Sequence, residues 1–363
     1  MKAQIAFLPG DGVGPEVLAE ARRVLETIGR RFNHTFDIVE GDIGGVAIDK
    51  YDSPLPAPTI ELCKKADAVL LGAVGNKKYD SLPAAKKPER GLLELRTLLG
   101  NFANLRPVFV FDPLADSSTV RPEVVRGVDI MFVRELLGGI YFGTPRFREG
   151  NRAVDTEVYT VEEVQRVSRV AFELARTRRK HVTSVDKANV LESSILWRQT
   201  VVEVAKEFPD VQLDHLYVDN CAMQLILRPK QFDVIVTNNL FGDILSDEGG
   251  VLAGSLGMLP SGSIGGRAGF YEPVHGSAPD IAGTGKANPI GAIISVGMML
   301  EYSFKLPELA ARVQRAVAHV IDKGYRTADI VSSGKTLMTT SQMGEIICEA
   351  IAADDANEAK YAT

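Results

Sequence analysis

Residues 4–28 read "QIAFLPGDGVGPEVLAEARRVLETI", and this stretch indicates the fold class. A short apolar run ends at glycines, and Pro15 then opens an amphipathic pattern with helical period. Two further apolar runs, "TFDIVEGDIGG" and "DAVLLGAVG" (67–75), flank the helical segment "PAPTIELCKKA". The resulting order β-α-β-α-β predicts an α/β protein whose sheet contains parallel strand pairs.

The turn "GDGVGPE" (10–16) has the position of a dinucleotide-binding turn, between a strand and a helix. Its glycines are spaced Gly-x-Gly-x-Gly, whereas the dinucleotide fingerprint is Gly-x-Gly-x-x-Gly. We therefore favour a tight turn that needs positive φ angles over a nucleotide contact.

Length and composition limit the classes of protein. A chain of 363 residues predicts two domains, or one large core with an insertion. The hydrophobic content of 45% and the charged content of 24% are typical of a globular protein. The net charge is −6, and the densest basic cluster, "ARTRRKH" (175–181), ends a helical pattern, so we expect no nucleic-acid partner.

The cysteines and the apolar runs indicate the compartment. Cys63, Cys221 and Cys348 lie far apart, which argues against a disulfide framework or a structural zinc site and favours a reducing compartment. The first residues lack the pattern of a secretory signal. The longest apolar run, "IGAIISVGMML" (290–300), is shorter than the about 20 residues of a membrane span, so it predicts a buried helix. We expect a cytoplasmic protein with no membrane partner.

The middle of the chain is rich in strand-like runs, namely "NLRPVFVF", "VDIMFVREL", "GGIYFG" and "VDTEVYT". They precede the helix "VEEVQRVSRVAFELART" and predict an arm or a second sheet. From residue 181 a strand–helix rhythm returns with strands "HVTSVDK", "LDHLYVDN" and "FDVIVTNN". The last third predicts Gly/Pro-rich loops and two or three amphipathic helices.

The segment "NLFGDILSDEG" (239–249) places Asp243 and Asp247 four residues apart in the first turns of a helix. Like charges at this spacing cost roughly 0.2–0.5 kcal/mol, so either a bound cation or solvent must accommodate them. Lys187, Asp219 and Asp243 each follow the C-terminal end of a successive strand, where open α/β sheets bind ligands. Because carboxylate oxygens suit Mg²⁺ and Mn²⁺, we favour a divalent-cation site.

A long loop, "EPVHGSAPDIAGTGKANP" (272–289), combines small residues and prolines with His275, Asp280 and Asn288. Its backbone N–H groups are suited to an anion or an adenine ring. A loop of this length in a compact domain is usually functional, so we favour binding over a solvated connector.

Several motifs occur in one order along nearly the whole chain: "LPGDGVGPEV", "ERGLLELR", "NLRP", "VRELLGGIYFG", "SVDKANVL", "YVDNCAMQLI", "NLFGDILSDE", "EPVHGSAPDIAG" and "TSQMG". Through them the sequence resembles the β-decarboxylating dehydrogenases, which act on isopropylmalate, isocitrate, homoisocitrate and tartrate. The resemblance implies the isocitrate/isopropylmalate dehydrogenase-like fold, an α/β fold with a mixed central sheet and two domains, which is not a Rossmann nucleotide fold.

The resemblance also implies how the chain is divided. The first domain would comprise residues 1–101 and 254–363 and carry most NAD contacts. The second would comprise residues 102–253, with the metal and substrate residues and an arm at about 141–160. The arm would lie in the interface of a homodimer whose active sites are shared between subunits.

The implied activity is the metal-dependent oxidative decarboxylation of 3-isopropylmalate to 4-methyl-2-oxopentanoate and CO₂, with reduction of NAD, in leucine biosynthesis. Homoisocitrate and tartrate are the alternative substrates within the family. A metal- or nucleotide-binding module without turnover is the alternative from a different class.

Residue by residue, the resemblance assigns Mg²⁺ or Mn²⁺ to Asp219, Asp243 and Asp247, with one ligand from the partner subunit. It assigns catalysis to Lys187, as the base for the substrate hydroxyl, and to Tyr141, as the proton donor to C3. Substrate binding falls to Arg96, Arg106, Arg134 and Asp219, because an arginine fork binds a carboxylate through two parallel hydrogen bonds. Taken alone, each arginine would be a surface residue.

The resemblance further implies an apolar pocket for the isopropyl group, formed by Leu92, Leu93 and Val190, with core packing as the alternative role of the leucines. The implied NAD contacts are Asn76, Glu89, Glu272, His275, Gly276, Ser277, Ala278, Pro279, Asp280, Ile281 and Asn288. Relatives that use NADP resemble this loop but carry lysine at position 280 and tyrosine at 281, so we expect a preference for NAD.

Two stretches depart from the family pattern. "GNKKYDS" (75–81) replaces a common Gly-Pro-Lys-Trp run, so the implied nicotinamide contact of Asn76 lies in a stretch that differs from the family pattern. Gly249 and Gly250 stand where alanine or larger apolar residues are common, which predicts a looser helix, since glycine costs up to about 1 kcal/mol relative to alanine.

Overall fold

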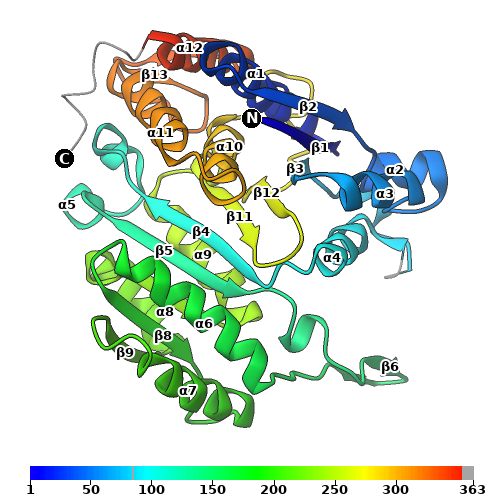
Figure 1. Cartoon of the computed structure of the whole chain (residues 1–363), viewed down its shortest axis with the longest axis vertical. Helices are drawn as coiled ribbons and strands as arrows, with labels where there is room; N and C mark the ends of the chain where they lie inside the picture. Colours follow the sequence, from blue (N-terminus) through cyan, green and yellow to red (C-terminus); the bar gives the residue numbers. More distant parts are fainter. Residues whose placement is uncertain (84–85, 354–363) are drawn as a thin grey trace. The chain divides into compact units, whose positions relative to one another are not determined.

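The computed structural model describes residues 1–83 and 86–353. The chain forms two compact units, which we call unit 1 (Met1–Gly100 and Gly254–Thr363) and unit 2 (Asn101–Ala253). Both units combine strands with helices, and both contain parallel and antiparallel strand pairs (Figure 1). The predicted α/β class with mixed sheet pairing is therefore confirmed.

In unit 1 the strands lie in the order β2-β1-β3-β12-β11. Their bounds are β1 Lys2–Gly10, β2 Thr35–Glu40, β3 Ala68–Ala73, β11 Pro260–Ile264 and β12 Gly269–Pro273. The pairs of β1 with β2, β1 with β3 and β3 with β12 are parallel, whereas β11 and β12 form an antiparallel hairpin.

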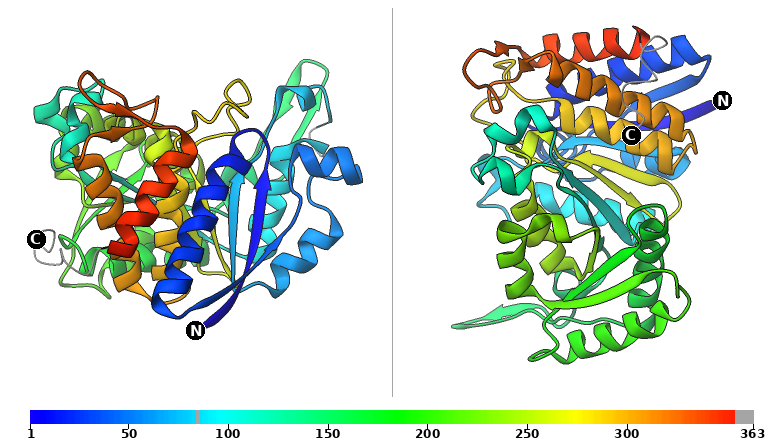
Figure 2. Two further views of the ribbon diagram at one scale, coloured as in Figure 1. Left: turned by 90° about the horizontal axis from the view of Figure 1, so that it is seen from above. Right: turned by 90° about the vertical axis from the view of Figure 1, so that its left-hand side faces the viewer.

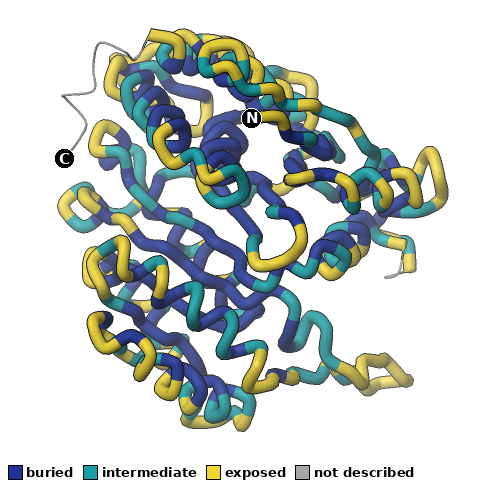
Figure 3. The backbone as a smooth tube through the Cα atoms, viewed as in Figure 1, coloured by how far each residue is buried: buried dark blue, intermediate teal, exposed yellow. Residues whose placement is uncertain are grey.

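Helices cover both faces of the unit 1 strands. On one face α1 (Gly14–Phe32) and α10 (Ile290–Tyr302) form an inner layer, and α11 (Pro307–Asp322) and α12 (Thr340–Ala353) pack outside them; Figure 2 shows α1, α11 and α12 side by side. The other helices of unit 1 are α2 Gly45–Tyr51, α3 Ala57–Lys65 and α4 Pro88–Leu99, with 3₁₀ turns η1 Lys77–Tyr79 and η6 Leu256–Met258 and the short strands β13 Tyr325–Arg326 and β14 Thr336–Leu337. Residues 290–300 are buried throughout, which confirms the predicted buried helix (Figure 3).

In unit 2 the strands lie in the order β4-β5-β10-β8-β9. Helices α6 and α7 pack together on one face, and α8 and α9 on the other. The bounds are β4 Ala103–Phe109, β5 Asp129–Glu135, β8 His181–Asp186, β9 Gln212–Tyr217, β10 Val234–Thr237, α5 Pro122–Val125, α6 Val161–Arg176, α7 Glu192–Ala205, α8 Val218–Leu227, α9 Asn239–Leu252, η3 Asp112–Ser117, η4 Gly139–Tyr141 and η5 Pro229–Gln231. This order places the C-terminal ends of β10, β8 and β9 along one edge.

Some strand predictions are wrong. The run "GGIYFG" contains the 3₁₀ turn η4 rather than a strand, because Gly139 has a φ of 74° and turns the chain. Only Val154 of "VDTEVYT" belongs to a strand; the hairpin of β6 (Phe147–Glu149) and β7 (Arg152–Val154) lies earlier and is almost fully exposed (Figure 3). Strands β11 and β12 were not predicted, because their glycines, prolines and serine are typical of loops.

Helix α9 continues through Gly249 and Gly250 to Leu252. Both glycines are buried, and a Cβ at Gly249 would lie 3.1 Å from the ring of Phe132 and 3.4 Å from Val108. The absence of a side chain thus allows α9 to pack closely on β4 and β5, which explains a glycine where helix propensity alone would favour alanine.

We expect Gly249→Ala to lower the free energy of unfolding by about 1 kcal/mol or more, because overpacking a buried site outweighs the gain in helix propensity. Gly297→Ala in α10 is the matched control: its Cβ would meet Ala310 and Val313 at 3.6–3.7 Å, which is ordinary contact. It should stabilise by up to about 1 kcal/mol. Urea unfolding of both variants measures the two signs, and equal stabilisation would show that α9 has room for a methyl group.

Within the described residues, none of the helices combines the length and the apolar character that a bilayer crossing requires.

Candidate active site

Two arginines of unit 2 lie beside each other on one face of the β4–β5 pair. Arg134 of β5 is opposite Asn104 of β4, and Arg106 lies two residues beyond Asn104, on the same face. Both side chains are buried, with exposed fractions of 1% for Arg134 and 7% for Arg106. Because a buried guanidinium must be paired, this face requires acidic partners.

Helix α9 covers this face and supplies the acids. Asp243 contacts Nη1 of Arg134 and lies 3.3 Å from Nη2 of Arg106. Asp247, one helical turn later, lies 3.1 Å from Nη1 of Arg106. A Cβ at Gly242 would lie 2.7 Å from Cγ of Arg134, so glycine is needed where the arginine stem passes beneath α9. The predicted neighbours Arg106, Arg134, Asp243 and Asp247 are thus in contact.

The two acids have the donor character that a divalent cation needs. Asp247 has a raised pKa, because of partial burial and the charge of Asp243, which Arg106 only partly offsets. An added positive charge would relieve this cost. Carboxylate oxygens also suit Mg²⁺ and Mn²⁺, so the pair fits a hard divalent cation.

Tyr141 contacts the same acid from the turn η4. Its hydroxyl donates to Oδ2 of Asp243 at 2.9 Å, and the guanidinium of Arg134 lies 5.7 Å from the centre of its ring. Partial burial and then the charge of Asp243 raise the pKa of Tyr141. The phenol therefore holds its proton at neutral pH. We call Arg106, Arg134, Tyr141, Asp243 and Asp247 the arginine–aspartate cluster.

The turn before Tyr141 is held by Glu135, which is fully buried. Its carboxylate accepts hydrogen bonds from the backbone N–H groups of Leu137 at 3.0 Å and Gly138 at 2.7 Å. Gly138 and Gly139 lie against the ring of Tyr159, where a Cβ would clash. The motif "ELLGGIY" is thus a rigid turn that positions the Tyr141 side chain.

Lys187 and Asp219 form a second pair in unit 2. They follow β8 and β9, whose last residues, Asp186 and Tyr217, are in register. Nζ of Lys187 donates to Oδ1 of Asp219 at 2.6 Å. This hydrogen bond is the main cause of the lowered pKa of Asp219, which is exposed. The predicted proximity of these two residues thus follows from adjacent parallel strands.

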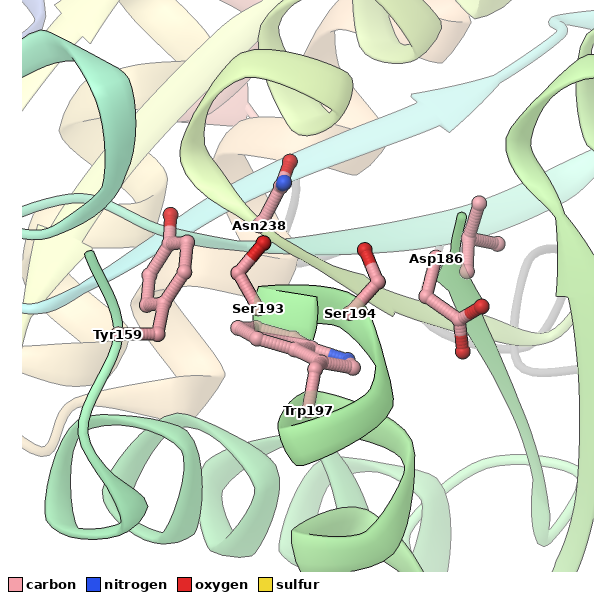
Figure 4. A pocket seen from close by; sticks show the side chains of 7 residues that line it. Tyr159, Asp186, Ser193, Ser194, Trp197 and Asn238 are labelled. Atoms are coloured by element: carbon pink, nitrogen blue, oxygen red, sulfur yellow. The ribbon is translucent and has the colours of Figure 1, made fainter. Parts of the chain in front are cut away.

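Polar side chains from several segments of unit 2 gather around a small pocket, among them Ser193, Ser194 and Asn238 (Figure 4). Ser194 Oγ accepts from the backbone N–H of Lys187 at 3.1 Å. Asn238 caps α9 by accepting from Phe241 N at 2.8 Å, and Glu157 accepts from Asn238 Nδ2 at 3.0 Å and also bonds Ser193. The space among these side chains is too small for a water molecule. The Lys187 turn and the start of α9 are therefore held by one packed network.

The three predicted metal ligands do not meet in one chain. Across residues 1–83 and 86–353, no set of three or more His, Cys, Asp or Glu side chains is placed to hold a metal. Asp219 follows β9, which is two strands from β10, or roughly 10 Å at ordinary strand spacing. One chain therefore presents two partial sets, the arginine–aspartate cluster and the Lys187–Asp219 pair.

Unit 1 holds the third predicted substrate arginine. Arg96 of α4 is buried, and its Nη2 donates to Oε1 of Glu272 on β12 at 2.8 Å. Its Nε is buried and has no hydrogen-bond partner within residues 1–83 and 86–353. Such an unsatisfied donor is costly and indicates a binding role, which an incoming carboxylate would fulfil. Glu272, a predicted NAD contact, serves here as the counterion of Arg96.

The loop that follows β12 contains most of the predicted NAD contacts. His275 Nδ1 lies 2.9 Å from the carbonyl of Gly276, so it carries the proton, and burial lowers the pKa of the ring. Nε2 is then an acceptor, buried and without a partner among the residues that the structure describes. An N–H donor of a bound base would satisfy it, so the loop fits a nucleotide.

Other residues of this loop differ in their exposure to solvent and in the hydrogen bonds that they already make. Asp280 and Pro279 are exposed, Ala278 and Ile281 are half-buried, and Ser277 is buried. The side chain of Asn288 already caps α10 through Ile290 N at 3.0 Å and donates to Asp329 at 3.0 Å. A role for the Asn288 side chain toward the cofactor stays a prediction.

The three predicted pocket residues differ in their packing and in their exposure to solvent. Leu92 packs against the core of unit 1, whereas Leu93 is half-buried and is not part of that core cluster. Val190 lies in unit 2 and is 67% exposed. Of the two leucines, Leu93 is thus the better candidate for a substrate contact.

The unusual stretch 75–81 has a local structural explanation. Tyr79 is buried and donates to the carbonyl of Gly45 at 2.9 Å, so it anchors the stretch to α2. Asn76 accepts from Lys78 N at 2.9 Å and caps the turn η1. Glu89 is exposed in the first turn of α4. The nicotinamide contacts assigned to Asn76 and Glu89 stay predictions.

Sequence reasoning missed several polar neighbours of the cluster. Asn239 Oδ1 accepts from both Nε and Nη2 of Arg134, at 3.0 and 2.7 Å. Ser246 Oγ accepts from Arg106 Nη1 at 2.8 Å, and Asn104 Oδ1 accepts from Arg106 Nε at 2.9 Å. Asn239 and Ser246 lie on the helix that carries the two acids, which is the signal that could have found them.

Comparisons with known proteins agree over nearly the whole chain. The family described as isocitrate/isopropylmalate dehydrogenase matches residues 4–347. A protein of Halalkalibacterium halodurans named 3-isopropylmalate dehydrogenase is 56% identical over 97% of this chain and 99% of its own length. A protein of the same name from Wolinella succinogenes is 55% identical over 95% of this chain and 97% of its own. The crystal structure of isocitrate dehydrogenase from Methylococcus capsulatus superposes with a TM-score of 0.86 at 35% identity, covering 96% of this chain and 99% of that one.

Proposed function

The chain belongs to the isocitrate/isopropylmalate dehydrogenase family, and we propose that it is an NAD-dependent enzyme that oxidatively decarboxylates 3-isopropylmalate in leucine biosynthesis. The observation that carries this proposal is the 56% identity, over nearly the full length, with a relative of that name. The arginine–aspartate cluster supports it, because the reaction needs cationic groups for two carboxylates and oxygen donors for a divalent ion. We propose the cytoplasm as its compartment.

Substrate binding falls to the three arginines. Arg106 and Arg134 are preassembled on one face of unit 2, and Arg96 of unit 1 has an unused Nε donor. A guanidinium fork binds a carboxylate through parallel hydrogen bonds, and burial strengthens this attraction. When the substrate carboxylates engage Arg106 and Arg134, oxygens of Asp243 and Asp247 become available to a cation.

Asp243 and Asp247 would hold the Mg²⁺ or Mn²⁺ ion, and Asp219 would come from a second copy of the chain. This arrangement accounts for two partial sets in one chain and makes the active sites of a homodimer shared. The exposed hairpin β6–β7 is then the arm between the copies. When bound, the ion acts as a Lewis acid toward the oxygen on C2 and stabilises negative charge there.

Two side chains of this protein would transfer the protons of the reaction. Lys187 would accept the proton of the C2 hydroxyl, directly or through water, and NAD⁺, when bound, would supply the acceptor for the hydride lost from C2. The resulting ketone at C2 lets the β-carboxylate leave as CO₂, and its bonding electrons form an enolate. Tyr141, kept protonated by its raised pKa, donates a proton to C3 and completes 4-methyl-2-oxopentanoate.

Cofactor binding falls to unit 1. We propose that residues 275–281 contact the adenosine half of NAD, with His275 Nε2 accepting from the base and Asp280 accepting from the ribose hydroxyls. The contacts of Asn76, Glu89 and Asn288 complete the proposal, and the NAD molecule supplies the hydride acceptor.

One assay tests this function and its alternatives. NADH formation is followed with purified 3-isopropylmalate, homoisocitrate, isocitrate, tartrate and malate in the presence of Mn²⁺. We expect the highest kcat/KM with 3-isopropylmalate. A higher value with homoisocitrate or tartrate would reassign the substrate within the family, and no turnover with any acid would favour a binding module.

The apolar pocket has its own test in Leu93→Ala. We expect the KM for 3-isopropylmalate to rise more than that for malate, by a ratio that corresponds to roughly 1–3 kcal/mol, since only the former has an isopropyl group. Leu92→Ala is the control, because Leu92 packs on the core and its truncation should chiefly lower stability. Equal rises in KM for both acids in Leu93→Ala would assign Leu93 to core packing as well.

The cofactor preference should depend on Asp280 and Ile281. The Asp280 carboxylate is suited to the 2′- and 3′-hydroxyls of NAD and repels the 2′-phosphate of NADP. The double variant Asp280→Lys/Ile281→Tyr should shift the ratio of kcat/KM values toward NADP by roughly 1–3 kcal/mol, the range of charge-assisted hydrogen bonds. If the parent uses NADP as well as NAD, or the variant gains nothing for NADP, the ribose lies elsewhere.

A further inference from the structure

The turn "GDGVGPE" (10–16) has no role in the function proposed above, although it has the position of a nucleotide-binding turn. In the structure it lies against the cofactor loop. Gly12, with a φ of 58°, is so close to this loop that a Cβ would overlap the carbonyl of Ser277 at 1.9 Å. The next residue, Val13, donates its backbone N–H to the same carbonyl at 2.8 Å. The turn and the loop are therefore joined through backbone atoms.

Glu16 makes a second junction. Its two carboxylate oxygens accept hydrogen bonds from the backbone N–H groups of Gly283 and Gly285, the latter at 3.1 Å. An acid in the first turn of a helix normally serves the helix dipole. Glu16 instead bonds two backbone donors that lie far along the chain, so it acts on the loop.

The segment that Glu16 holds has few other constraints. Gly283 and Gly285 have φ angles of 75° and 65°, and a Cβ at either would have no neighbour within 4 Å. Glycine has the largest conformational freedom of any residue, so ordering two glycines is costly. Because these two glycines have no side chains to pack, hydrogen bonds order the segment, among them the bond from the Thr284 hydroxyl to the carbonyl of Ile281 at 2.6 Å.

Neighbouring elements complete the support. Thr340, at the start of α12, donates from its N–H to Gly285 O at 2.8 Å and from its hydroxyl to Ala287 O at 2.6 Å. Asp11 secures the turn itself, because its buried carboxylate accepts from the N–H groups of Gly45 and Gly75, each at 2.8 Å. The motifs "GDGVGPE" and "TSQMG" thus converge on one loop.

We propose that Glu16 is a positioning residue for cofactor binding, holding the 283–285 segment in the conformation that binds the adenosine half of NAD. This inference rests on the proposed function, since it takes that loop as the NAD site. Glu16 does not touch the cofactor. Its contribution is preorganisation: it orders the glycine segment before NAD arrives, so binding does not carry that entropic cost. The N–H groups of Gly283 and Gly285 are also thereby occupied and do not serve the pyrophosphate.

The test compares Glu16→Ala and Glu16→Gln with the parent protein and with Glu308→Gln. Glu308 is an exposed acid in the first turn of α11 and also follows a proline, so it controls for loss of a helix-terminal charge. We expect the Kd for NADH, measured by calorimetry, to rise about tenfold in Glu16→Ala, which corresponds to about 1.4 kcal/mol. Glu16→Gln should recover part of the affinity, because its carbonyl oxygen can still accept one hydrogen bond.

Two further readouts separate positioning from general damage. Amide hydrogen exchange of residues 281–287, measured without cofactor, should quicken in Glu16→Ala and stay unchanged in Glu308→Gln. The KM for 3-isopropylmalate and the kcat at saturating NAD should stay within about threefold of the parent. An unchanged Kd for NADH in Glu16→Ala would overturn the inference. A rise in the KM for both NAD and 3-isopropylmalate, together with a fall in kcat and in the unfolding midpoint, would overturn it as well.

The same experiment distinguishes this inference from the proposed function. A parent protein that binds NADH but shows no isopropylmalate turnover contradicts the function, while the Glu16 variants still decide the inference. A parent protein that binds no NADH contradicts both.

Discussion

Replacing Asp243 with Asn should reduce turnover of 3-isopropylmalate at least about 100-fold, since Lewis-acid stabilisation is worth several kcal/mol and each 1.36 kcal/mol is tenfold in rate. The substitution removes one anionic oxygen donor from the proposed metal pair and one acceptor from Tyr141. The fold should survive, because Arg134 keeps two hydrogen bonds to Asn239 and asparagine retains one carbonyl acceptor. Turnover measured across a Mn²⁺ titration, beside a urea unfolding curve, checks both parts.

Asp210→Asn is the matched control for this loss. Asp210 also lies in unit 2, but it is exposed and pairs with Arg176 on the surface, where an ion pair contributes little. Its variant should turn over like the parent at every Mn²⁺ concentration. Near-normal turnover of Asp243→Asn at limiting Mn²⁺ would refute the metal assignment.

Lys187→Met should lower kcat by roughly 10²–10⁴-fold, the usual contribution of a positioned general base. Methionine keeps much of the apolar stem, so what is lost is the amine that we propose as the acceptor of the hydroxyl proton. Stability should change little, because Lys187 bonds an exposed partner, Asp219. The measurement is kcat with saturating substrate and cofactor, with and without added methylamine, which should restore part of the rate.

Lys206→Met serves as the control, because Lys206 is exposed and pairs only with Glu203 one turn earlier on the surface. It should retain full activity and gain nothing from methylamine. A Lys187→Met enzyme that keeps more than a third of the parent rate would make Lys187 a strand-end charge without a catalytic role.

Part of the candidate site could be predicted from local pattern. Asp243 and Asp247 share a helix, and a spacing of four residues places them one turn apart, as the structure shows. Lys187 and Asp219 each follow a strand, and parallel pairing of β8 with β9 then makes them neighbours. In both cases the side chains lie on or directly after a regular helix or strand. Their relative positions therefore follow from the helical period or the strand direction, which a few neighbouring residues are enough to predict.

Other features depended on contacts between distant segments. Nothing near Arg134 in the sequence indicates that Asn239 accepts two of its hydrogen bonds, or that Gly242 makes room for its stem. The hairpin β11–β12 was missed because glycine and proline have low strand propensity, and its place in the sheet depends on pairing with β3 and packing against α10. The roles of Leu92 and Leu93 likewise differ only through what each one packs against.

The sequence by itself determined the strand–helix alternation from residue 181 to α9, the buried helix at 290–300 and the spacing of acids on α9, because helical and strand periods are set by residues a few positions apart. Tertiary structure alone decided that Glu16 bonds the loop at 272–289, and that Arg96 pairs with Glu272 while its Nε has no partner among the described residues. It also decided that Asp219, Asp243 and Asp247 form no three-acid set within the described part of one chain. These partners are chosen by the order in which strands pair and by which helix covers which face. This arrangement of strands and helices leaves little unpaired charge buried in each unit. A short stretch of sequence cannot predict it, because the paired groups come from segments far apart in the chain.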